Sequence, residues 1–249
     1  DRIDSGPELV IRGPIADGTL QEFLKIRPPT FFLADFSTIT GKDWYRCLSI
    51  KPLDRSWIRT FDDFGVSVDI EREFENAKSG MKTIHAFTES ELLSQGPDVV
   101  IYDHRTGEVA DYISLFENDD KVVCTLIHCK GASGKKTSKP KKAATRVDDV
   151  YEVAGQVVKC LPFSRHPEDL KRELVRRIGT GSKLLRGTVK QLELILSNAV
   201  NKQFEYRICL VQPGLSASKL NQPVESVLAA AGEYISANTG FPPSFWISP

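Results

Sequence analysis

Apolar and polar residues in the middle of the chain follow a pattern that is typical of successive β-strands. Residues 98–103 (DVVIYD) form a short apolar run, and two longer runs follow at 108–116 (EVADYISLF) and 121–130 (KVVCTLIHCK). The last two are joined through the polar tripeptide Asn118-Asp119-Asp120, which is too short for a crossover connection. We therefore expect 108–116 and 121–130 to pair as an antiparallel hairpin.

The second half of the chain has the spacing of amphipathic helices. In residues 146–161, apolar side chains recur at intervals of three and four, which places them on one face of a helix. Further helices are predicted at 81–95, from Pro167 to Gly179, at 183–200 and at 223–238, and further strands at 64–75, 204–211 and 245–247. Strands that come first and then alternate with helices predict an α/β fold with a central mixed β-sheet flanked by helices.

The N-terminal part lacks such a period. Residues 1–56 are rich in Gly and Pro and contain only short apolar runs, so we expect short strands and turns there. We accordingly predict two regions, an irregular β-rich segment at 1–80 and a larger domain at 81–249.

The composition of the 249-residue chain is that of an ordinary globular protein, with 41% hydrophobic and 27% charged residues. Its formal net charge is zero, so the overall charge indicates no particular partner. No apolar run approaches the roughly 18 residues of a transmembrane helix, and the N-terminus lacks the apolar core of a signal peptide. The five cysteines are scattered without CxxC spacing, which favours reduced thiols and a cytoplasmic location over disulfides or a zinc site.

The predicted hairpin brings three polar residues together. If its turn is centred at Asp119-Asp120, then Asp111 lies opposite His128. Opposed residues share one face of a sheet, and so do residues two apart along one strand. We therefore expect Asp111, His128 and Lys130 to converge, whereas a shift of one residue in the pairing would move Asp111 to the other face.

These residue types suit the hydrolysis of a phosphodiester. A divalent metal that is held by a carboxylate polarises the phosphate and activates a water molecule. A lysine beside the metal can orient that water or stabilise the charge on the reacting phosphate. Asp111 and His128 are therefore candidate metal ligands for Mg²⁺ or Mn²⁺, and Lys130 is a candidate catalytic residue. The alternative interpretation is a set of solvated polar side chains.

At these residues the chain resembles the PD-(D/E)XK nuclease superfamily, whose motif is an Asp at a strand, a hairpin, and then (Asp/Glu)-x-Lys. Asp111 matches the first acid and His128-x-Lys130 the second element, while Gln156 resembles a helical Gln in several branches of the family. The stretch GEVADYI…LIHCKGASG…RVDDVYEVAGQ is also similar to nuclease-like domains at the C-termini of bacterial superfamily II helicases. The resemblance covers about residues 85–212. It implies a restriction-endonuclease-like fold, metal-dependent DNA cleavage and a helicase domain or subunit as partner in bacterial phage defence.

Two features depart from the family's pattern. His128 stands where an Asp or Glu is usual, and neutral imidazole suits Mn²⁺ or another transition metal better than Mg²⁺. The literal Pro97-Asp98 lies one strand earlier, and Asp98 does not lie opposite His128 in this register, so it ranks second to Asp111. Glu108 in the turn and Glu152 on the helix are further acids near the predicted site, and each is also explained as a solvated residue.

A basic loop follows the hairpin. Residues 131–145 are low in complexity and contain no apolar side chain larger than alanine. The basic residues are Lys135, Lys136, Lys139, Lys141 and Lys142, with Arg146 directly after the loop. Because the loop leaves the predicted site directly, we expect these side chains to bind the phosphates of DNA. Its glycines do not have the spacing of a phosphate-binding P-loop.

Three functions are compatible with these patterns. The first is a metal-dependent nuclease that acts on DNA. The second is a non-catalytic nucleic-acid-binding module that keeps a degenerate nuclease fold and has lost metal binding with His128. The third is a protein-interaction domain within a larger complex.

Overall fold

A computed structural model of the chain contains two compact units, residues 1–50 and 51–249. The structure describes residues 10–13, 16–26, 28–32, 37–45, 51–104, 106–132, 142–144 and 147–249, without the side chains of 10–18, 23, 26, 32, 148 and 149. Residues 51–80 group with 81–249, whereas the sequence pattern placed a boundary after residue 80.

The first unit consists of short strands and one short helix. Strands β1 (Val10–Gly13) and β2 (Ala16–Thr19) form an antiparallel hairpin, helix α1 (Leu20–Ile26) follows, and β3 (Thr30–Phe32), β4 (Thr38–Thr40) and β5 (Asp43–Tyr45) form an antiparallel sheet. The described residues of this unit thus contain the expected short strands, while helix α1 was not predicted.

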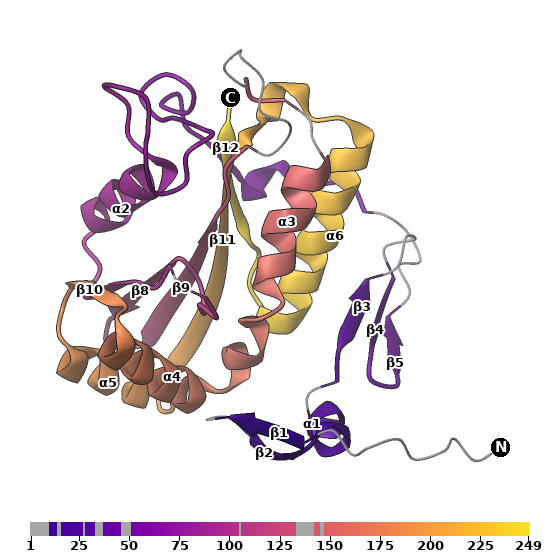
Figure 1. Ribbon diagram of the computed structural model, residues 1–249, viewed down its shortest axis with the longest axis vertical. Coiled ribbons are helices and arrows are strands. Elements are labelled where there is room, and N and C mark those ends of the chain that lie inside the picture. Colours follow the sequence, from indigo (N-terminus) through magenta and orange to yellow (C-terminus); the bar gives the residue numbers. More distant parts are fainter. Residues whose placement is uncertain are drawn as a thin grey trace. The chain divides into compact units, whose positions relative to one another are not determined.

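A seven-stranded mixed sheet forms the centre of the second unit, in the order β10-β7-β8-β9-β11-β12-β6 (Figure 1). Its strands are β6 (Ile58–Thr60), β7 (Val99–Tyr102), β8 (Tyr112–Glu117), β9 (Lys121–Cys129), β10 (Lys183–Arg186), β11 (Gln203–Ser216) and β12 (Ser244–Ser248). β7 pairs antiparallel with β10 and β8, and β8 pairs antiparallel with β9, while β9, β11, β12 and β6 are parallel neighbours. The predicted α/β class with a central mixed sheet is confirmed.

Helices lie on both faces of this sheet. They are α2 (Ile84–Ser94), α3 (Val147–Val157), α4 (Pro167–Thr180), α5 (Val189–Asn198) and α6 (Gln222–Thr239), with 3-10 turns at Arg55–Trp57, Leu161–Arg165 and Ala217–Lys219. Helices α3 and α6 run side by side along one face (Figure 1), whereas Phe87 of α2 packs with Ile127 and Cys129 on the other. Of the helices described, none combines the length and the apolar character that crossing a membrane requires.

The predicted hairpin forms in the predicted register. β8 and β9 are antiparallel, and Tyr112 pairs with Ile127, so that the next pair of positions along the hairpin is Asp111 and His128. Because side chains alternate along a strand, Ile127 and Cys129 face α2 while His128 faces the opposite side. The end of β9 therefore presents side chains to both faces of the sheet.

Two predicted elements differ from the structure. Residues 64–75 form turns with isolated bridges in place of a strand, and their alternation arises because Phe64, Val68 and Ile70 pack into the core. The helix predicted at 183–200 is confirmed only from Val189 onward. Gly187 has a positive φ of 83°, which a helix does not accommodate, and residues before it form the edge strand β10 instead.

Candidate metal-binding and catalytic site

Asp111 directly precedes β8, at the point where the regular ladder with β9 ends. Its Oδ2 accepts a hydrogen bond of 2.7 Å from the backbone N–H of Cys129, and its Oδ1 lies 2.7 Å from Nδ1 of His104. The residue is only 3% exposed. Asp111 thus places a buried carboxylate, held on both of its oxygens, at the end of the sheet.

His128 contacts Cys160 and is not part of the group of ligand atoms around Asp111, although the register places Asp111 and His128 opposite each other. The Nε2 of His128 lies 3.4 Å from Sγ of Cys160, which follows α3, and the ring is buried. Burial lowers the pKa of His128 to about 4, so the imidazole is neutral at pH 7. Alternation fixes the direction of a side chain only within the ladder. Asp111 lies one residue beyond it, and its carboxylate binds the N–H of Cys129 instead.

His85 approaches Asp111 from helix α2. The helix begins after Thr83, whose side chain accepts a hydrogen bond from a first-turn N–H, and His85 is its second residue. Its Nδ1 lies 3.1 Å from the hydroxyl of Tyr102, and its Nε2 lies 3.7 Å from Oδ1 of Asp111. Within the described part of the chain, this Nε2 is a buried atom with no hydrogen-bond partner. A polar atom left in this state costs free energy unless a ligand satisfies it.

Electrostatics keep Asp111 ionised in spite of its burial. Desolvation alone would raise the pKa of Asp111, but the hydrogen bonds from His104 and from the backbone N–H of Cys129 hold it below the ordinary value. The same hydrogen bond to Asp111 raises the pKa of His104. By contrast, desolvation lowers the pKa of His85 to about 4. The site therefore combines a carboxylate with a neutral imidazole, which is the state that binds metal ions.

Lys130 lies immediately after β9 and adds a positive charge beside the carboxylate. Its Nζ lies 3.2 Å from Oε1 of Glu73 and 3.8 Å from Oε2 of Glu152 on α3. Burial alone would lower the pKa of Lys130, but the charges of Glu73, Glu152 and Asp111 raise it above the ordinary value. The side chain is 30% exposed, so the ammonium can meet a ligand that arrives from solvent.

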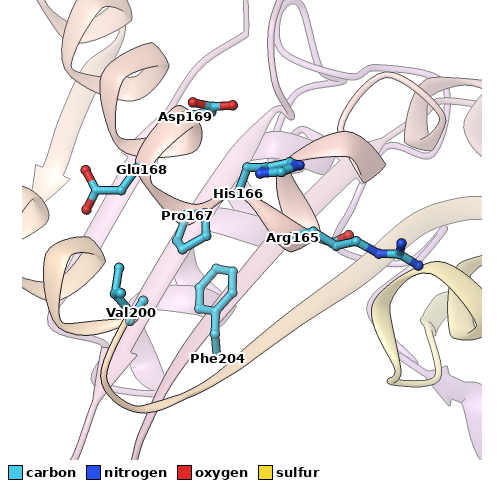
Figure 2. A pocket seen from close by; sticks show the side chains of 9 residues that line it. Arg165, His166, Pro167, Glu168, Asp169, Val200 and Phe204 are labelled. Atoms are coloured by element: carbon cyan, nitrogen blue, oxygen red, sulfur yellow. The ribbon is translucent and has the colours of Figure 1, made fainter. Parts of the chain in front are cut away.

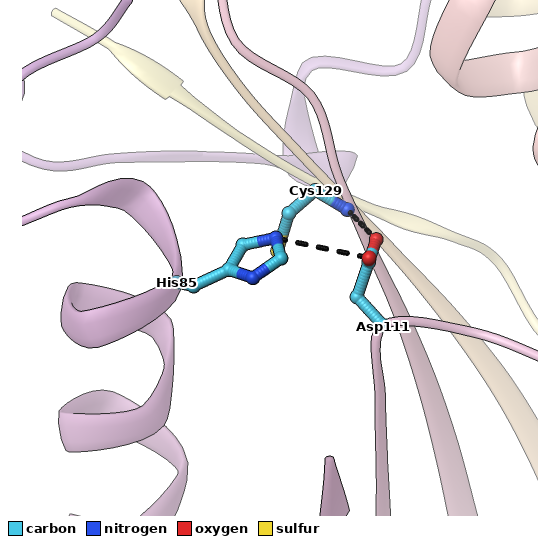
Figure 3. A group of neighbouring side chains, drawn as sticks. All are labelled: His85, Asp111 and Cys129. Carbon is cyan, nitrogen blue, oxygen red and sulfur yellow. Dashed lines mark hydrogen bonds and ion pairs between the residues drawn. The ribbon is translucent and has the colours of Figure 1, made fainter. Parts of the chain in front are cut away.

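Cys129, the last residue of β9, brings a buried thiol close to His85 and Asp111. Its thiol lies 3.6 Å from Oγ1 of Thr88, and burial raises its pKa well above the ordinary value. One ligand atom each from His85, Asp111 and Cys129 lies within 4.8 Å of the other two (Figure 3). The three residues come from helix α2, from the loop before β8 and from the end of β9. They therefore come close to one another only when the helix packs on the sheet.

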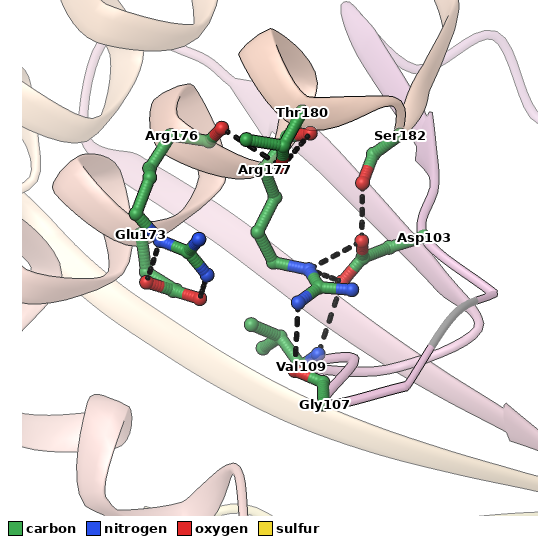
Figure 4. Close-up of polar contacts among 8 residues, drawn as sticks. All are labelled: Asp103, Gly107, Val109, Glu173, Arg176, Arg177, Thr180 and Ser182. Atoms are coloured by element: carbon green, nitrogen blue, oxygen red, sulfur yellow. Dashed lines mark hydrogen bonds and ion pairs between the residues drawn. The ribbon is translucent and has the colours of Figure 1, made fainter. Parts of the chain in front are cut away.

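A buried ion pair holds the loop that carries His104 and Asp111. Nε of Arg177 on α4 lies 2.5 and 2.6 Å from the two carboxylate oxygens of Asp103, which also accept hydrogen bonds from Ser182 and from the N–H of Val109 (Figure 4). A second nitrogen of Arg177 donates to the carbonyl of Gly107 at 2.8 Å. In turn, the N–H of Asp103 donates to the carbonyl of Asp111. The ion pair therefore fixes the backbone from which Asp111 projects.

The other predicted site residues lie at different distances from this cluster. Gln156 on α3 has a buried Oε1 without a hydrogen-bond partner among the described residues, and Glu152 contacts Lys130. Glu108 is half-buried, and its charge contributes to the raised pKa of His104.

Asp98 lies at the opposite end of β8. Its carboxylate accepts a hydrogen bond of 2.8 Å from the N–H of Glu117, five residues along the strand from Tyr112, or roughly 17 Å. Asp98 thus lies far from the end of β8 at which Asp111 binds the N–H of Cys129.

The basic loop is only partly described. Lys135, Lys136, Lys139, Lys141 and Arg146 lie outside the described residues, and Lys142 is exposed. Ala144 forms a bridge with Leu215, so the chain that leaves β9 returns beside the end of β11. The expectation that this loop binds phosphates stays a prediction.

Sequence patterns did not indicate His85, His104, Glu73 or Cys129 as site residues. His85 and Glu73 come from segments that precede the hairpin, and Cys129 alternates with His128 and Lys130 along β9. Cys129 packs with Phe87 of α2, and its ligand atom lies close to those of His85 and Asp111. Only His104, seven residues before Asp111, could have been suggested by a local pair of histidine and acid.

A separate surface hollow of about 480 Å³ lies near the start of α4 (Figure 2). It is lined by Ser164, Arg165, His166, Pro167, Glu168, Asp169, Ala199, Val200 and Phe204. Phe204 pairs with Val122, six residues along β9 from His128, or roughly 20 Å. The hollow thus belongs to the other end of the sheet and contributes nothing to the Asp111 site.

Comparison of the chain with protein-family models, with curated proteins and with solved structures found no match.

Proposed function

We propose that the chain is a metal-dependent nuclease that hydrolyses phosphodiester bonds in DNA, with a fold that resembles the PD-(D/E)XK superfamily. The order helix α2, strands β7, β8 and β9, helix α3 and strand β11, around a mixed sheet, agrees with the restriction-endonuclease-like fold that the resemblance implies. The single observation that carries the proposal is the buried carboxylate of Asp111, which binds the backbone N–H of Cys129, the residue directly before the partly exposed Lys130.

The residues present fit a divalent metal ion. The buried Nε2 of His85, which has no hydrogen-bond partner in the described part of the chain, lies 3.7 Å from Oδ1 of Asp111. A nitrogen and an oxygen donor therefore already lie close together. A divalent ion bound there supplies Lewis acidity toward the phosphate and lowers the pKa of a bound water. Asp111 is the anionic ligand in this proposal, and His85 takes the place that sequence reasoning gave to His128.

Lys130 and His104 have separate roles. The ammonium of Lys130 stabilises the negative charge that develops on the reacting phosphate, an interaction that strengthens in the transition state. His104 donates through Nδ1 to Asp111 and thereby orients the carboxylate, as supporting residues around metal ligands commonly do. Glu73 and Glu152 form ion pairs with Lys130 and thereby orient its side chain when no phosphate is bound.

The cellular setting is proposed from the sequence resemblance. A DNA-cleaving domain of this type works beside a helicase domain or subunit, in the same protein or complex, in the cytoplasm of a bacterium during phage defence. The exposed Lys142 belongs to the basic loop that would guide DNA to the site.

The second candidate is a non-catalytic nucleic-acid-binding module. One observation favours it, because His128 at the family's second acidic position is buried against Cys160 and supplies no ligand to the Asp111 cluster. In that case Lys130 and the basic loop bind phosphates without cleaving them.

Two experiments separate the candidates. Metal-stripped protein is titrated with Mg²⁺, Mn²⁺ or Zn²⁺ in the presence of end-labelled DNA, single-stranded and duplex. Cleavage that depends on added metal supports the nuclease. If no metal supports cleavage, a gel shift at low and high salt distinguishes the nucleic-acid-binding module from a protein-interaction domain. Salt-sensitive binding supports the nucleic-acid-binding module, and no binding at either salt concentration supports a protein-interaction domain.

A further inference from the structure

Three donor atoms of different chemical kinds converge beside Asp111. One ligand atom each from His85, Asp111 and Cys129 lies within 4.8 Å of the other two, and the residues are 3%, 3% and 1% exposed. Two aromatic rings flank His85, with the rings of Tyr102 and Tyr112 centred 5.6 and 5.7 Å from that of His85. Buried polar atoms of this kind cost free energy unless a ligand or a hydrogen bond satisfies them.

Hydrogen bonding within the protein satisfies only part of the cluster. Asp111 has partners on both oxygens, and the thiol of Cys129 has Thr88 as a long-range partner at 3.6 Å. The Nε2 of His85 has none among the described residues, and it points toward the carboxylate (Figure 3). The missing partner of His85 therefore lies at the point that Asp111 and Cys129 also face.

The spacing suits a tetrahedral ion. Nitrogen and oxygen ligands about 2.0–2.1 Å from Zn²⁺ are separated from each other by about 3.3 Å in a tetrahedron. The observed 3.7 Å between His85 Nε2 and Asp111 Oδ1 is close to this value. The sulfur of Cys129, at a bond length of about 2.3 Å, has to approach by at most about 1.2 Å.

We propose that His85, Asp111 and Cys129 form a three-ligand site for a transition-metal ion, with Zn²⁺ as the best match. Thiolate and imidazole donors select such ions, whereas Mg²⁺ prefers an octahedron of oxygen ligands. Binding releases the thiol proton of Cys129 to solvent, so that the ligands supply one thiolate, one carboxylate and one neutral imidazole. Three protein ligands leave a fourth coordination position open. The inference deepens the proposed function by naming the metal class, and the ligand set stands independently of whether DNA is cleaved.

Cobalt spectroscopy tests the site without any activity measurement. The full chain, stripped by chelator, is titrated with Co²⁺, which replaces Zn²⁺ and is coloured. One equivalent is expected to give the visible bands of a four-coordinate ion together with a thiolate-to-cobalt charge-transfer band. Addition of Zn²⁺ should bleach these bands, and an excess of Mg²⁺ should not. A wild-type protein that gives no such spectrum overturns the proposal.

Variants assign the ligands one by one. Cys129→Ser is expected to lose the charge-transfer band, and His85→Ala and Asp111→Asn to weaken Co²⁺ binding at least about 10- to 100-fold. Cys209→Ser is the matched control, because Cys209 is an equally buried cysteine on β11, and it should keep the full spectrum. A charge-transfer band that survives in Cys129→Ser contradicts the assignment.

A second measurement uses only the wild-type protein, so it can be made even if a variant does not fold. X-ray absorption of the zinc-loaded wild-type protein should show one sulfur at about 2.3 Å and nitrogen or oxygen ligands at about 2.0–2.1 Å. An all-oxygen shell would overturn the proposal. The two functional claims also separate cleanly. A cobalt spectrum without DNA cleavage supports the metal site and contradicts the nuclease alone, while cleavage without a cobalt spectrum contradicts this metal site alone.

Discussion

The carboxylate of Asp111 accepts a hydrogen bond of 2.7 Å from the backbone N–H of Cys129 across the end of the β8–β9 hairpin. On the α2 side, Oδ1 of the same carboxylate lies 3.7 Å from Nε2 of His85, a buried nitrogen that has no hydrogen-bond partner among the residues that the structure describes. His128 contacts Cys160 instead. The metal-binding half of the candidate site therefore lies on one face of the sheet. Lys130, which contacts segments from both faces, supplies the positive charge.

Removal of Lys130 should reduce catalysis without unfolding the protein. Lys130→Ala is expected to lower the rate of DNA cleavage by about 10²–10³, because it removes a contact that stabilises transition-state charge. Lys121→Ala is the matched control, since Lys121 begins the same strand, is similarly exposed and forms an ion pair with Glu205. Single-turnover cleavage rates at saturating metal give the comparison. Equal rates for the two variants would remove Lys130 from the catalytic site.

The ion pair between Arg177 and Asp103 should be critical for stability. Arg177→Ala leaves a fully buried carboxylate without its partner, and a loss of about 3–5 kcal/mol is expected in the free energy of unfolding. The neighbouring Arg176, whose exposed side chain pairs with Glu173, provides the control (Figure 4). Arg176→Ala should cost no more than about 0.5 kcal/mol. The free energy of unfolding of both variants is measured by urea denaturation. Similar losses in the two variants would contradict the structural role given to Arg177.

The hairpin could be predicted from the sequence because its register depends on local features. The short polar connection at 118–120 and the alternation of the two strands determine which residues lie opposite each other, and the pairing of Tyr112 with Ile127 follows that prediction. The direction of the Asp111 carboxylate depends on a different kind of contact. It is set by the N–H of Cys129 at the end of the ladder, where strand alternation no longer applies.

His85 and Glu73 could not be predicted as site residues for a related reason. His85 stands on helix α2, and Glu73 lies among turns that the sequence suggested as a strand. Both reach Asp111 and Lys130 only through tertiary packing, in which the N–H of Gly131 binds Glu73 and the N–H of His85 binds the Glu73 carbonyl. No short spacing in the sequence connects these positions to the hairpin.

The pH dependence of stability should reveal that His128 is a buried neutral histidine. Its folded pKa of about 4 lies below the unfolded value of about 6.5, so the unfolded chain binds more protons between these two pH values. Stability is therefore retained above about pH 6.5 and falls as the pH is lowered toward 4. For His128 alone, the loss between pH 7 and pH 5 is about 2 kcal/mol.

Metal-free protein is suited to this measurement, because chelator removes any contribution from bound ions. The difference in unfolding free energy between pH 7 and pH 5, measured in urea, should shrink by about 2 kcal/mol in His128→Gln. His85, whose pKa is also about 4, accounts for part of the remaining dependence. An unchanged pH dependence in His128→Gln would show that His128 does not resist protonation in the folded state.

Neutralisation of the basic loop should weaken DNA binding and flatten its dependence on salt. The variant changes Lys135, Lys136, Lys139, Lys141 and Lys142 to Gln. Each lost phosphate contact is expected to reduce the slope of log K against log salt by about 0.9. A control variant changes Lys183 and Lys190, two exposed lysines on β10 and α5, and should bind as the wild type does. Unchanged affinity at both low and high salt in the loop variant would show that the loop is a solvated connection.

The most direct test of the account compares Asp111 with the other acid that the sequence motif offered, Asp98. Asp111→Asn removes the charge that binds the metal, whereas Asp98→Asn alters a carboxylate at the far end of β8 that binds the N–H of Glu117. Metal-dependent cleavage of labelled DNA is measured for both variants and the wild type. We predict wild-type cleavage with a transition-metal ion, a loss of at least about 10²-fold in Asp111→Asn, and near-normal cleavage in Asp98→Asn. Normal cleavage by a folded Asp111→Asn protein would contradict the central claim.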